Sequence, residues 1–285
     1  MSERVGVVGG GIMGAGIAEV AARSGCHVIV REVDDAACAA SEHRISASIE
    51  RAVASGKLSG DESKEVLARL EFTTELDALA DRELVVEAVV EDETAKLDIF
   101  RALGPIVRED AILASNTSSI PIMKLAAASA CPDRVLGIHF FNPVPVLALV
   151  ELVPSLLTSD ETLEWAQKFA SERLGKQTIV CTDRAGFVVN ALLIPYILAA
   201  IRLVESGFVS PEDVDTAMVA GCAHPMGPLA LADLIGLDTT AAVAHSMYVE
   251  YKEPLYAPPP VLLRMVEAGL LGRKTGRGFY SYGKS

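Results

Sequence analysis

Short apolar runs alternate with segments of helical spacing through residues 5–140. The pattern begins with an apolar strand at residues 5–8, a glycine turn, a helical segment at residues 12–24 and an apolar strand at residues 28–30, which form a βαβ unit. The alternation continues with helices at 36–55, 61–70 and 93–103, and strands at 84–88, 112–115 and 135–140. It predicts an α/β fold with a Rossmann-type doubly wound sheet, in which ligands bind beyond the carboxyl ends of the strands.

The pattern changes in the last hundred residues, where apolar positions recur at helical spacing and no strand of similar length is evident before the tail. The first such run comprises Val188, Val189, Leu192, Leu193, Tyr196, Ile197, Ala200, Leu203 and Val204. We expect Pro195 to kink this helix, and Ser210 with Pro211 to begin the next one. The sequence therefore predicts a Rossmann domain at residues 1–183 and an all-α domain at residues 184–285.

Charge narrows the range of partners. The chain of 285 residues carries 38 acidic and 25 basic side chains, a formal net charge of -13, and its pI is near 4.9. Such a chain lacks the basic excess that neutralises nucleic-acid phosphates or binds an anionic lipid surface. We therefore expect neither a nucleic acid nor a membrane as partner, and any polyanionic ligand must be held by a local cluster of donors.

Cysteine usage indicates a reducing compartment. The cysteines are odd in number, widely scattered and never arranged as a CxxC pair: Cys26, Cys38, Cys131, Cys181 and Cys222. This arrangement suggests neither a disulfide framework nor a zinc site, so we expect no metal. No signal-peptide pattern precedes Val5, and the longest apolar stretches fall short of a clean membrane span. We expect a soluble, cytoplasmic protein.

The turn after the first predicted strand has the pattern G-x-G-x-x-G, formed by Gly9, Gly10, Gly11, Ile12, Met13 and Gly14. Glycines there allow a tight turn and close approach of a pyrophosphate, which the helix N-terminus attracts. Glu32 follows the second strand, 18 residues beyond Gly14, where a carboxylate can accept the ribose hydroxyls and repel a 2′-phosphate. The pattern favours NAD over NADP, although Arg31 beside Glu32 could approach a 2′-phosphate. The alternative is a glycine-rich turn that binds no ligand.

Three further segments have polar residues where strands end, at residues 115–119, 139–143 and 149–153. An imidazole at such an end is well placed as a general base, which makes His139 a candidate. Asn142-Pro143-Val144-Pro145 should reverse the chain, so that Glu151 returns toward the ring and can stabilise an imidazolium. A lone histidine is more often structural, and only the nearby glutamate and nucleotide motif favour catalysis.

Several motifs, in order, resemble the L-3-hydroxyacyl-CoA dehydrogenase family, especially its short 3-hydroxybutyryl-CoA dehydrogenase branch. The resemblance covers nearly the whole chain. The motifs are Gly9-Gly10-Gly11-Ile12-Met13-Gly14-Ala15-Gly16-Ile17-Ala18, Val86-Glu87-Ala88-Val89-Val90-Glu91, Ser115-Asn116-Thr117-Ser118-Ser119, His139-Phe140-Phe141-Asn142-Pro143-Val144-Pro145, Gly186-Phe187-Val188-Val189-Asn190 and Arg273-Lys274-Thr275-Gly276-Arg277-Gly278-Phe279-Tyr280. A family member of this kind would be an NAD-dependent dehydrogenase of acyl-CoA thioesters, and short acyl chains are preferred here because the chain carries no attached hydratase domain.

The resemblance implies a role for each matching residue. His139 resembles the family's general base and Glu151 its carboxylate partner. Ser118 resembles a serine that hydrogen-bonds the substrate oxygen and the nicotinamide side, and Asn190 resembles an asparagine that helps to hold the reacting oxygen. The remaining matches fall where the family contacts NAD: Glu91, Lys96, Asn116, Asn142 and Lys274.

The residues that would bind the CoA part of the substrate match the family pattern less well. Ser48 corresponds to a family serine near the CoA 3′-phosphate, but a lysine seven residues farther on is replaced by Ser55. Arg51 or Lys57 could supply the missing charge, and a carrier-protein thioester stays open. Ser48 and Asn190 could also be ordinary polar residues on helix faces.

Two other functions stay open. The first is a dehydrogenase of the same fold that acts on a free hydroxy acid or sugar acid, as the gulonate dehydrogenase relatives do. The second is a nucleotide-binding protein without turnover, like the crystallins of this lineage, although the intact set of candidate catalytic residues argues against it. The apolar second domain exceeds what one chain can bury, so we expect a homodimer formed through that domain.

Overall fold

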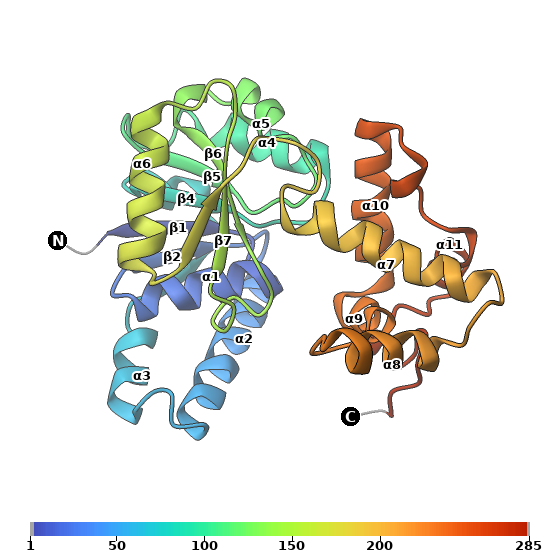
Figure 1. Cartoon of the computed structure of the whole chain (residues 1–285). Helices are drawn as coiled ribbons and strands as arrows, with labels where there is room; N and C mark the ends of the chain where they lie inside the picture. Colours follow the sequence, from blue (N-terminus) through green and yellow to red (C-terminus); the bar gives the residue numbers. More distant parts are fainter. Residues whose placement is uncertain (1–2, 284–285) are drawn as a thin grey trace. The chain divides into compact units, whose positions relative to one another are not determined.

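The computed structural model describes residues 3–283, which divide into two compact units (Figure 1). The first unit ends at Arg184 and the second begins at Ala185. None of the helices in the described residues is long and apolar enough to cross a membrane.

An eight-stranded sheet forms the centre of the first unit, in the order β3-β2-β1-β4-β5-β6-β7-β8. The strands are β1 (Arg4–Val8), β2 (His27–Arg31), β3 (Leu70–Thr73), β4 (Leu84–Glu87), β5 (Ile112–Ser115), β6 (Val135–Phe140), β7 (Leu149–Pro154) and β8 (Gln177–Val180). The first six strands are parallel, whereas β7 runs antiparallel to β6 and β8 runs parallel to β7. The first six follow the strand order of a doubly wound dinucleotide-binding sheet, so the predicted Rossmann fold is confirmed.

Helices cover both faces of this sheet. They are α1 (Ile12–Arg23), α2 (Asp35–Ala54), α3 (Gly60–Leu67), α4 (Glu93–Leu103), α5 (Ile122–Ala128) and α6 (Asp160–Lys168). In Figure 1, α1 and α2 pack against each other on one side of the sheet and α4 and α5 on the other. The parallel strands are therefore buried on both faces, which explains their nearly continuous apolar sequences.

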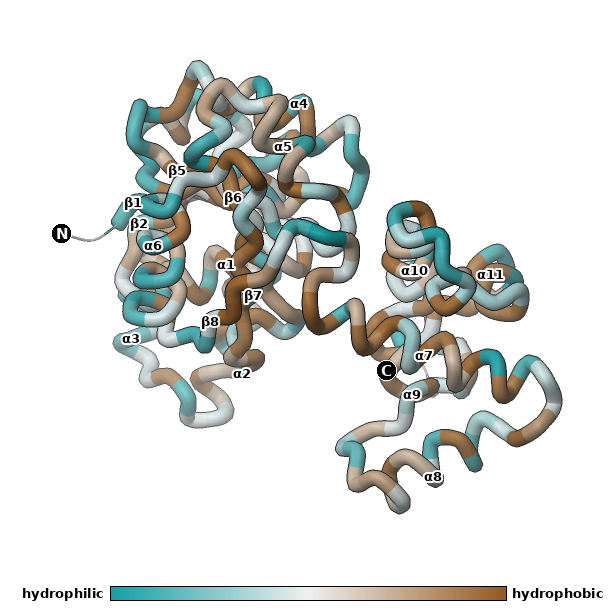
Figure 2. The backbone as a smooth tube through the Cα atoms, turned by 45° about the horizontal axis from the view of Figure 1, so that its top comes forward, coloured by the Kyte–Doolittle hydropathy of each residue, from teal (hydrophilic) through white to brown (hydrophobic). Residues whose placement is uncertain are grey.

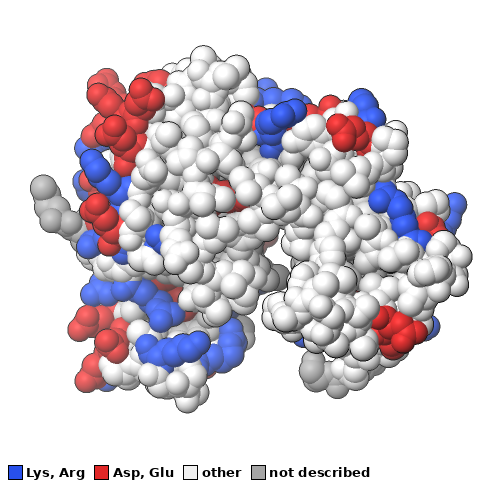
Figure 3. Space-filling view, in the orientation of Figure 1, with Lys and Arg blue, Asp and Glu red and all other residues white. Residues whose placement is uncertain are grey.

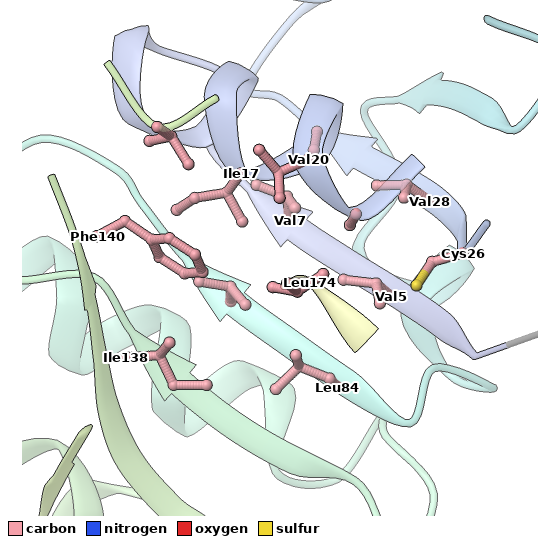
Figure 4. Packing of buried hydrophobic residues seen from close by; sticks show 14 of the residues in the cluster. Val5, Val7, Ile17, Val20, Cys26, Val28, Leu84, Ile138, Phe140 and Leu174 are labelled. Atoms are coloured by element: carbon pink, nitrogen blue, oxygen red, sulfur yellow. The ribbon is translucent and has the colours of Figure 1, made fainter. Parts of the chain in front are cut away.

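The core between α1 and the sheet follows from the two-residue period of the strands. Val7 of β1 lies beside Ile17 and Val20 of α1, and Val5, two residues earlier on the strand, belongs to the same buried cluster (Figure 4). Figure 2 shows hydrophobic residues concentrated along β6, β7 and β8 as well. The strand that carries His139 thus lies within a buried apolar layer.

The second unit is helical, as predicted. Its helices are α7 (Val189–Glu205), α8 (Pro211–Cys222), α9 (Pro228–Ile235), α10 (Leu237–Tyr251) and α11 (Pro260–Glu267). Ser210 caps α8 by accepting the Asp213 amide, with Pro211 in the first turn, and this start was also predicted. Apolar residues of α7, α9 and α10 form a separate core around Ile197 and Ala244.

The predicted bounds are accurate for the long or strongly apolar elements and poor at the edge of the sheet. Residues 93–103, 112–115 and 135–140 were predicted with the bounds of α4, β5 and β6. The helix expected at residues 61–70 was wrong at its end, because α3 stops at Leu67 and β3 begins at Leu70. β3 is a short, only partly buried strand, so its sequence lacks a clear apolar run.

Candidate functional site

The glycine turn leaves a set of backbone donors for an anion. Gly9 has φ +91°, and a Cβ at Gly14 would lie 1.7 Å from the Gly9 carbonyl oxygen, so both positions require glycine. A Cβ at Gly11 would meet nothing within 4 Å. The amides of Gly11, Ile12 and Met13, at the start of α1, have no acceptor within residues 3–283. Open space beside unpaired helix N-terminal amides fits the pyrophosphate of a dinucleotide.

Glu32 lies directly after β2 and is fixed beside this turn. Its Oε1 accepts hydrogen bonds from the Gly10 amide at 2.7 Å and from Ser41 Oγ at 2.8 Å. Arg31, which the sequence offered as a donor to a 2′-phosphate, instead donates from Nε to the Thr74 carbonyl at 3.1 Å. The Glu32 carboxylate is therefore held against the glycine turn, where Arg44 Nη1 also donates to the Gly10 carbonyl oxygen at 2.7 Å.

His139 and Glu151 form a buried pair on adjacent strands. The two residues are directly opposite in the antiparallel register of β6 and β7, so their side chains lie on the same face. His139 Nδ1 lies 2.7 Å from Glu151 Oε2, and the glutamate is fully buried. The Phe141 ring contacts the imidazole edge-to-face, with ring centroids 4.6 Å apart. The chain reversal predicted from the sequence does bring the two side chains together.

The connection between these strands is held by a lysine from a later segment. Lys176 Nζ donates to the carbonyl oxygens of Val144 at 2.6 Å and Leu147 at 2.7 Å. Burial, together with the charge of Arg23, lowers the pKa of Lys176. Asn142 is exposed in this connection, one residue beyond Phe141.

A loop of polar residues, 116–119, follows β5 and is called the serine loop below. Glu91 Oε1 accepts hydrogen bonds from the Ser118 amide at 3.1 Å and the Ser119 hydroxyl at 2.8 Å. On the other side, Asn116 Oδ1 accepts the Phe140 amide at 2.9 Å. The loop that carries Ser118 is therefore tied to the end of β6, beside His139.

Electrostatics favour the charged form of Glu91. Burial raises its pKa, but the Lys96 ammonium and hydrogen bonds from Thr117, Ser119 and the Ser118 amide outweigh burial and lower the pKa. Lys96 itself is buried, and its Nζ lies 3.3 Å from Glu91 Oε2. Both residues thus support the loop, whatever contact they make with a cofactor.

The sequence reasoning missed two residues of this network. Glu87 and Ser115 are neighbours in the parallel register of β4 and β5, and Ser115 Oγ donates to Glu87 Oε2 at 2.5 Å. Glu87 Oε1 pairs with Lys96 Nζ at 2.5 Å. A charged residue and a hydroxyl at the ends of two otherwise apolar strands were the signal that could have found them.

The other predicted residues lie apart from these contacts or belong to the second unit. Ser48 is partly exposed on α2. Asn190 is partly exposed in the first turn of α7, and Lys274 pairs with Asp238 at 2.6 Å. Within residues 3–283 no group of three metal-binding side chains occurs.

Comparison with known proteins decides the family. Residues 4–184 match the model of the 3-hydroxyacyl-CoA dehydrogenase NAD binding domain, and residues 186–282 match the model of the 3-hydroxyacyl-CoA dehydrogenase C-terminal domain. The chain belongs to the 3-hydroxyacyl-CoA dehydrogenase family. It is thus an NAD-dependent dehydrogenase, which agrees with the fit of the glycine turn to a dinucleotide.

Individual members of the family resemble the chain over its whole length. A 3-hydroxybutyryl-CoA dehydrogenase of Mycobacterium tuberculosis is 60% identical over 281 residues, which is 98% of each chain. The crystal structure of FadB2 from Mycobacterium tuberculosis has a TM-score of 0.98 at 60% identity and covers 99% of each chain. The structure of the (S)-3-hydroxybutyryl-CoA dehydrogenase PaaH1 from Ralstonia eutropha has a TM-score of 0.94 at 44% identity, with all of both chains covered.

Proposed function

We propose that this dehydrogenase interconverts L-3-hydroxyacyl-CoA and 3-oxoacyl-CoA with NAD(H), and that it prefers short acyl chains such as the 3-hydroxybutyryl group. The observation that carries the proposal is the buried His139–Glu151 pair, because it is a base with a fixed acidic partner beside the serine loop of an NAD-binding sheet. The preference for a short chain is supported by the names of the relatives in Mycobacterium tuberculosis and Ralstonia eutropha.

His139 is the general base of the proposed reaction. Glu151 engages Nδ1, so Nε2 is the atom that takes the proton of the 3-hydroxyl group. The buried carboxylate stabilises the imidazolium that results and keeps the ring in one orientation. NAD, when bound, supplies the acceptor for the hydride that leaves C3. In the reverse direction the imidazolium returns the proton to the oxygen.

The substrate oxygen needs hydrogen-bond donors in addition to the base. We assign this role to the hydroxyl of Ser118 and to Asn190. The support for Ser118 is its loop, which Glu91 and Asn116 fix next to the end of β6. Asn190 is assigned through the family resemblance alone.

NAD is held at several points in this proposal. The amides of Gly11, Ile12 and Met13 bind the pyrophosphate. Glu32 binds the ribose hydroxyls through Oε2, which receives no hydrogen bond from residues 3–283. Further predicted contacts complete the site: Gly9, Gly10, Gly14, Glu91, Lys96, Asn116, Ser118, Asn142 and Lys274.

The CoA moiety is assigned to the outer face of α2. Ser48 lies there, and Arg51 and Lys57 are exposed nearby. Figure 3 shows Lys and Arg beside Asp and Glu over α2 and α3, so cationic donors are present locally in an acidic protein. Either Arg51 or Lys57 replaces the lysine that is absent at Ser55.

We further propose a cytoplasmic homodimer joined through the second unit. That unit exposes large apolar side chains, with Leu192 73% and Phe208 80% exposed. Contiguous patches of such side chains mark interfaces between subunits, and the proposal requires these residues to contribute to one. The unpaired cysteines fit a reducing compartment.

The decisive experiment follows the oxidation of NADH and of NADPH with acetoacetyl-CoA, longer 3-oxoacyl-CoA thioesters and free acetoacetate. We expect oxidation of NADH with acetoacetyl-CoA, weaker activity with long chains, and little with NADPH. Equal rates with free acetoacetate would instead indicate a dehydrogenase of free acids. Binding of NADH without turnover of any substrate would indicate a non-catalytic nucleotide-binding protein.

A further inference from the structure

Glu87 is a buried carboxylate for which the proposed reaction has no use. It is fully buried at the end of β4, and each of its oxygens has donors. Oε1 accepts the Lys96 ammonium at 2.5 Å and the Val89 amide at 2.7 Å. Oε2 accepts the Ser115 hydroxyl at 2.5 Å. A buried charge with a complete set of partners holds those partners in place, because releasing any of them leaves a desolvated charge unsatisfied.

The first route from Glu87 to Ser118 runs through hydroxyl groups. Ser115 Oγ donates to Glu87 and accepts the Thr117 amide at 3.1 Å. Thr117 Oγ1 in turn accepts the amides of Ser119 at 3.2 Å and Ile120 at 3.0 Å. The backbone on both sides of Ser118 is therefore fixed by a chain of hydrogen bonds that begins at Glu87.

The second route runs through charges. Lys96 Nζ, which Glu87 holds, lies 3.3 Å from Glu91 Oε2. The other oxygen of Glu91 accepts the Ser118 amide at 3.1 Å. Both routes start at Glu87; the first ends at the amides on either side of Ser118 and the second at the Ser118 amide itself, so Glu87 is linked to this segment twice.

We propose that Glu87 is a positioning residue that fixes Ser118 for the reaction through Ser115 and Lys96. The proposal rests on the proposed function, in which Ser118 contacts the substrate oxygen. Glu87 itself touches neither substrate nor cofactor in this assignment. Glu87 acts only through the residues that it holds, and the proposal assigns its effect on turnover to Ser118.

A double-mutant cycle tests this dependence. Glu87→Gln, Ser118→Ala and the double variant are compared by kcat and by KM for NADH and acetoacetyl-CoA. We expect Glu87→Gln to lower kcat about tenfold or more while each KM changes less than about threefold, because the loss is one of alignment. The double variant should lie within about threefold of Ser118→Ala, since residues that act as a unit are not additive. Additive losses in the double variant would overturn the proposal.

Glu19→Gln is the matched control. Glu19 is also buried in the first unit and also pairs with one cation, Arg23 at 3.1 Å, but it does not contact the serine loop. We expect its kcat to stay within about twofold of the parent chain, even where the thermal midpoint falls. An equal loss of kcat in Glu19→Gln and Glu87→Gln would mean that the effect is a general consequence of removing a buried charge, and the proposal would fail.

Ser115→Ala covers the case in which Glu87→Gln does not fold. This variant removes the first route but keeps the Glu87–Lys96 ion pair. It should lower kcat and show the same non-additivity with Ser118→Ala, and an unchanged kcat would overturn the proposal. If Ser118→Ala alone retains full activity, the role of Ser118 in the proposed function fails. If Ser118→Ala lowers kcat but neither Glu87→Gln nor Ser115→Ala does, only the inference about Glu87 is refuted.

Discussion

His139 and Glu151 are directly opposite each other on antiparallel strands, and the imidazole Nδ1 lies 2.7 Å from the carboxylate Oε2. Both side chains are buried, so little solvent screens the interaction between the carboxylate and an imidazolium. The pair is supported by the strand backbone and not by a flexible loop. Its geometry is therefore set before any ligand binds.

Glu151→Gln is expected to lower kcat by about 10²-fold or more, because an amide can neither balance the imidazolium charge nor impose the same tautomer. Steady-state kinetics with acetoacetyl-CoA measure the loss, and circular dichroism checks that the fold persists. Glu71→Gln, an exposed change on β3, is the control and should leave kcat unaltered. A loss below about threefold in Glu151→Gln would show that the pair has only a structural role.

His139→Gln removes the base itself. We expect kcat to fall by about 10²- to 10⁴-fold, the usual contribution of a general base. NADH affinity, measured by fluorescence titration, should stay within about threefold because the glycine turn is unchanged. Normal turnover in this variant would refute the assignment of the imidazole as base.

Two glycines of the turn should respond differently to alanine. Gly14→Ala places a methyl group 1.7 Å from the Gly9 carbonyl oxygen, so it should lower stability by about 1–3 kcal/mol or more. Gly11→Ala meets nothing within 4 Å and should keep the thermal midpoint, but it should raise the Kd for NADH about tenfold by crowding the pyrophosphate. Thermal unfolding and NADH titration of both variants distinguish the two effects. Equal NADH affinity of Gly11→Ala and the parent chain would contradict the predicted binding mode.

Low pH should reduce the stability of the folded protein, because protonation of Glu91 removes its interactions with the serine loop. Burial alone would raise the pKa of this carboxyl, but Lys96 and the loop hydrogen bonds bring it below its ordinary value of 4.5. A lowered pKa in the folded state contributes stability above pH 4.5, and this contribution is lost as the pH falls through the folded pKa. Because Glu91 is partly exposed, this contribution to the free energy of unfolding is no more than about 1 kcal/mol.

The pH effect is measured by comparing Glu91→Gln with the parent chain. The parent should have the higher thermal midpoint at pH 7, by roughly 2–4 °C, and the two curves should approach each other as the pH falls below 4.5. A difference that stays constant down to pH 3 would show that protonation of Glu91 is not its cause.

The cysteines should differ in how fast they are alkylated. Burial and the negative charges of Glu151 and Asp183 raise the pKa of Cys181 to about 11. Its thiol is therefore protonated at pH 8, and the thiolate is the reactive form. We expect iodoacetamide at pH 8 to label exposed Cys222 first, with Cys181 protected until the protein unfolds, as mass spectrometry of peptides would show. Early labelling of Cys181 would contradict this environment.

The sequence predicts the elements whose local pattern is strong. β5 and β6 are fully buried apolar runs, and α4 has a polar start at Asp92 that accepts the Ala95 amide. No strand was predicted at β7, although it is mostly buried. The strands at the rim of the sheet, β3 and β8, were missed because they are short and only partly buried. Their conformation is decided by pairing with β2 and β7, which no local window contains.

The candidate site divides in the same way. The contact between His139 and Glu151 follows from a reversal within twelve residues, so a local argument reached it. The pairing of Glu87 with Ser115 joins residues 28 positions apart, and it exists only because β4 and β5 are neighbours in one register. Sequence reasoning placed both strands but had no means to align their ends.

His139 and Glu151 lie on the same face of the sheet because side chains alternate between its two faces along the paired strands β6 and β7. Displacing β7 by one position relative to β6 would turn Glu151 to the opposite side of the sheet and present Val150 or Leu152 to the imidazole. A slip in strand alignment would thus abolish proton transfer in one step, even with both side chains still present. An engineer who wishes to graft this proton-handling unit onto another sheet must therefore transplant the alignment of the two strands together with the two side chains.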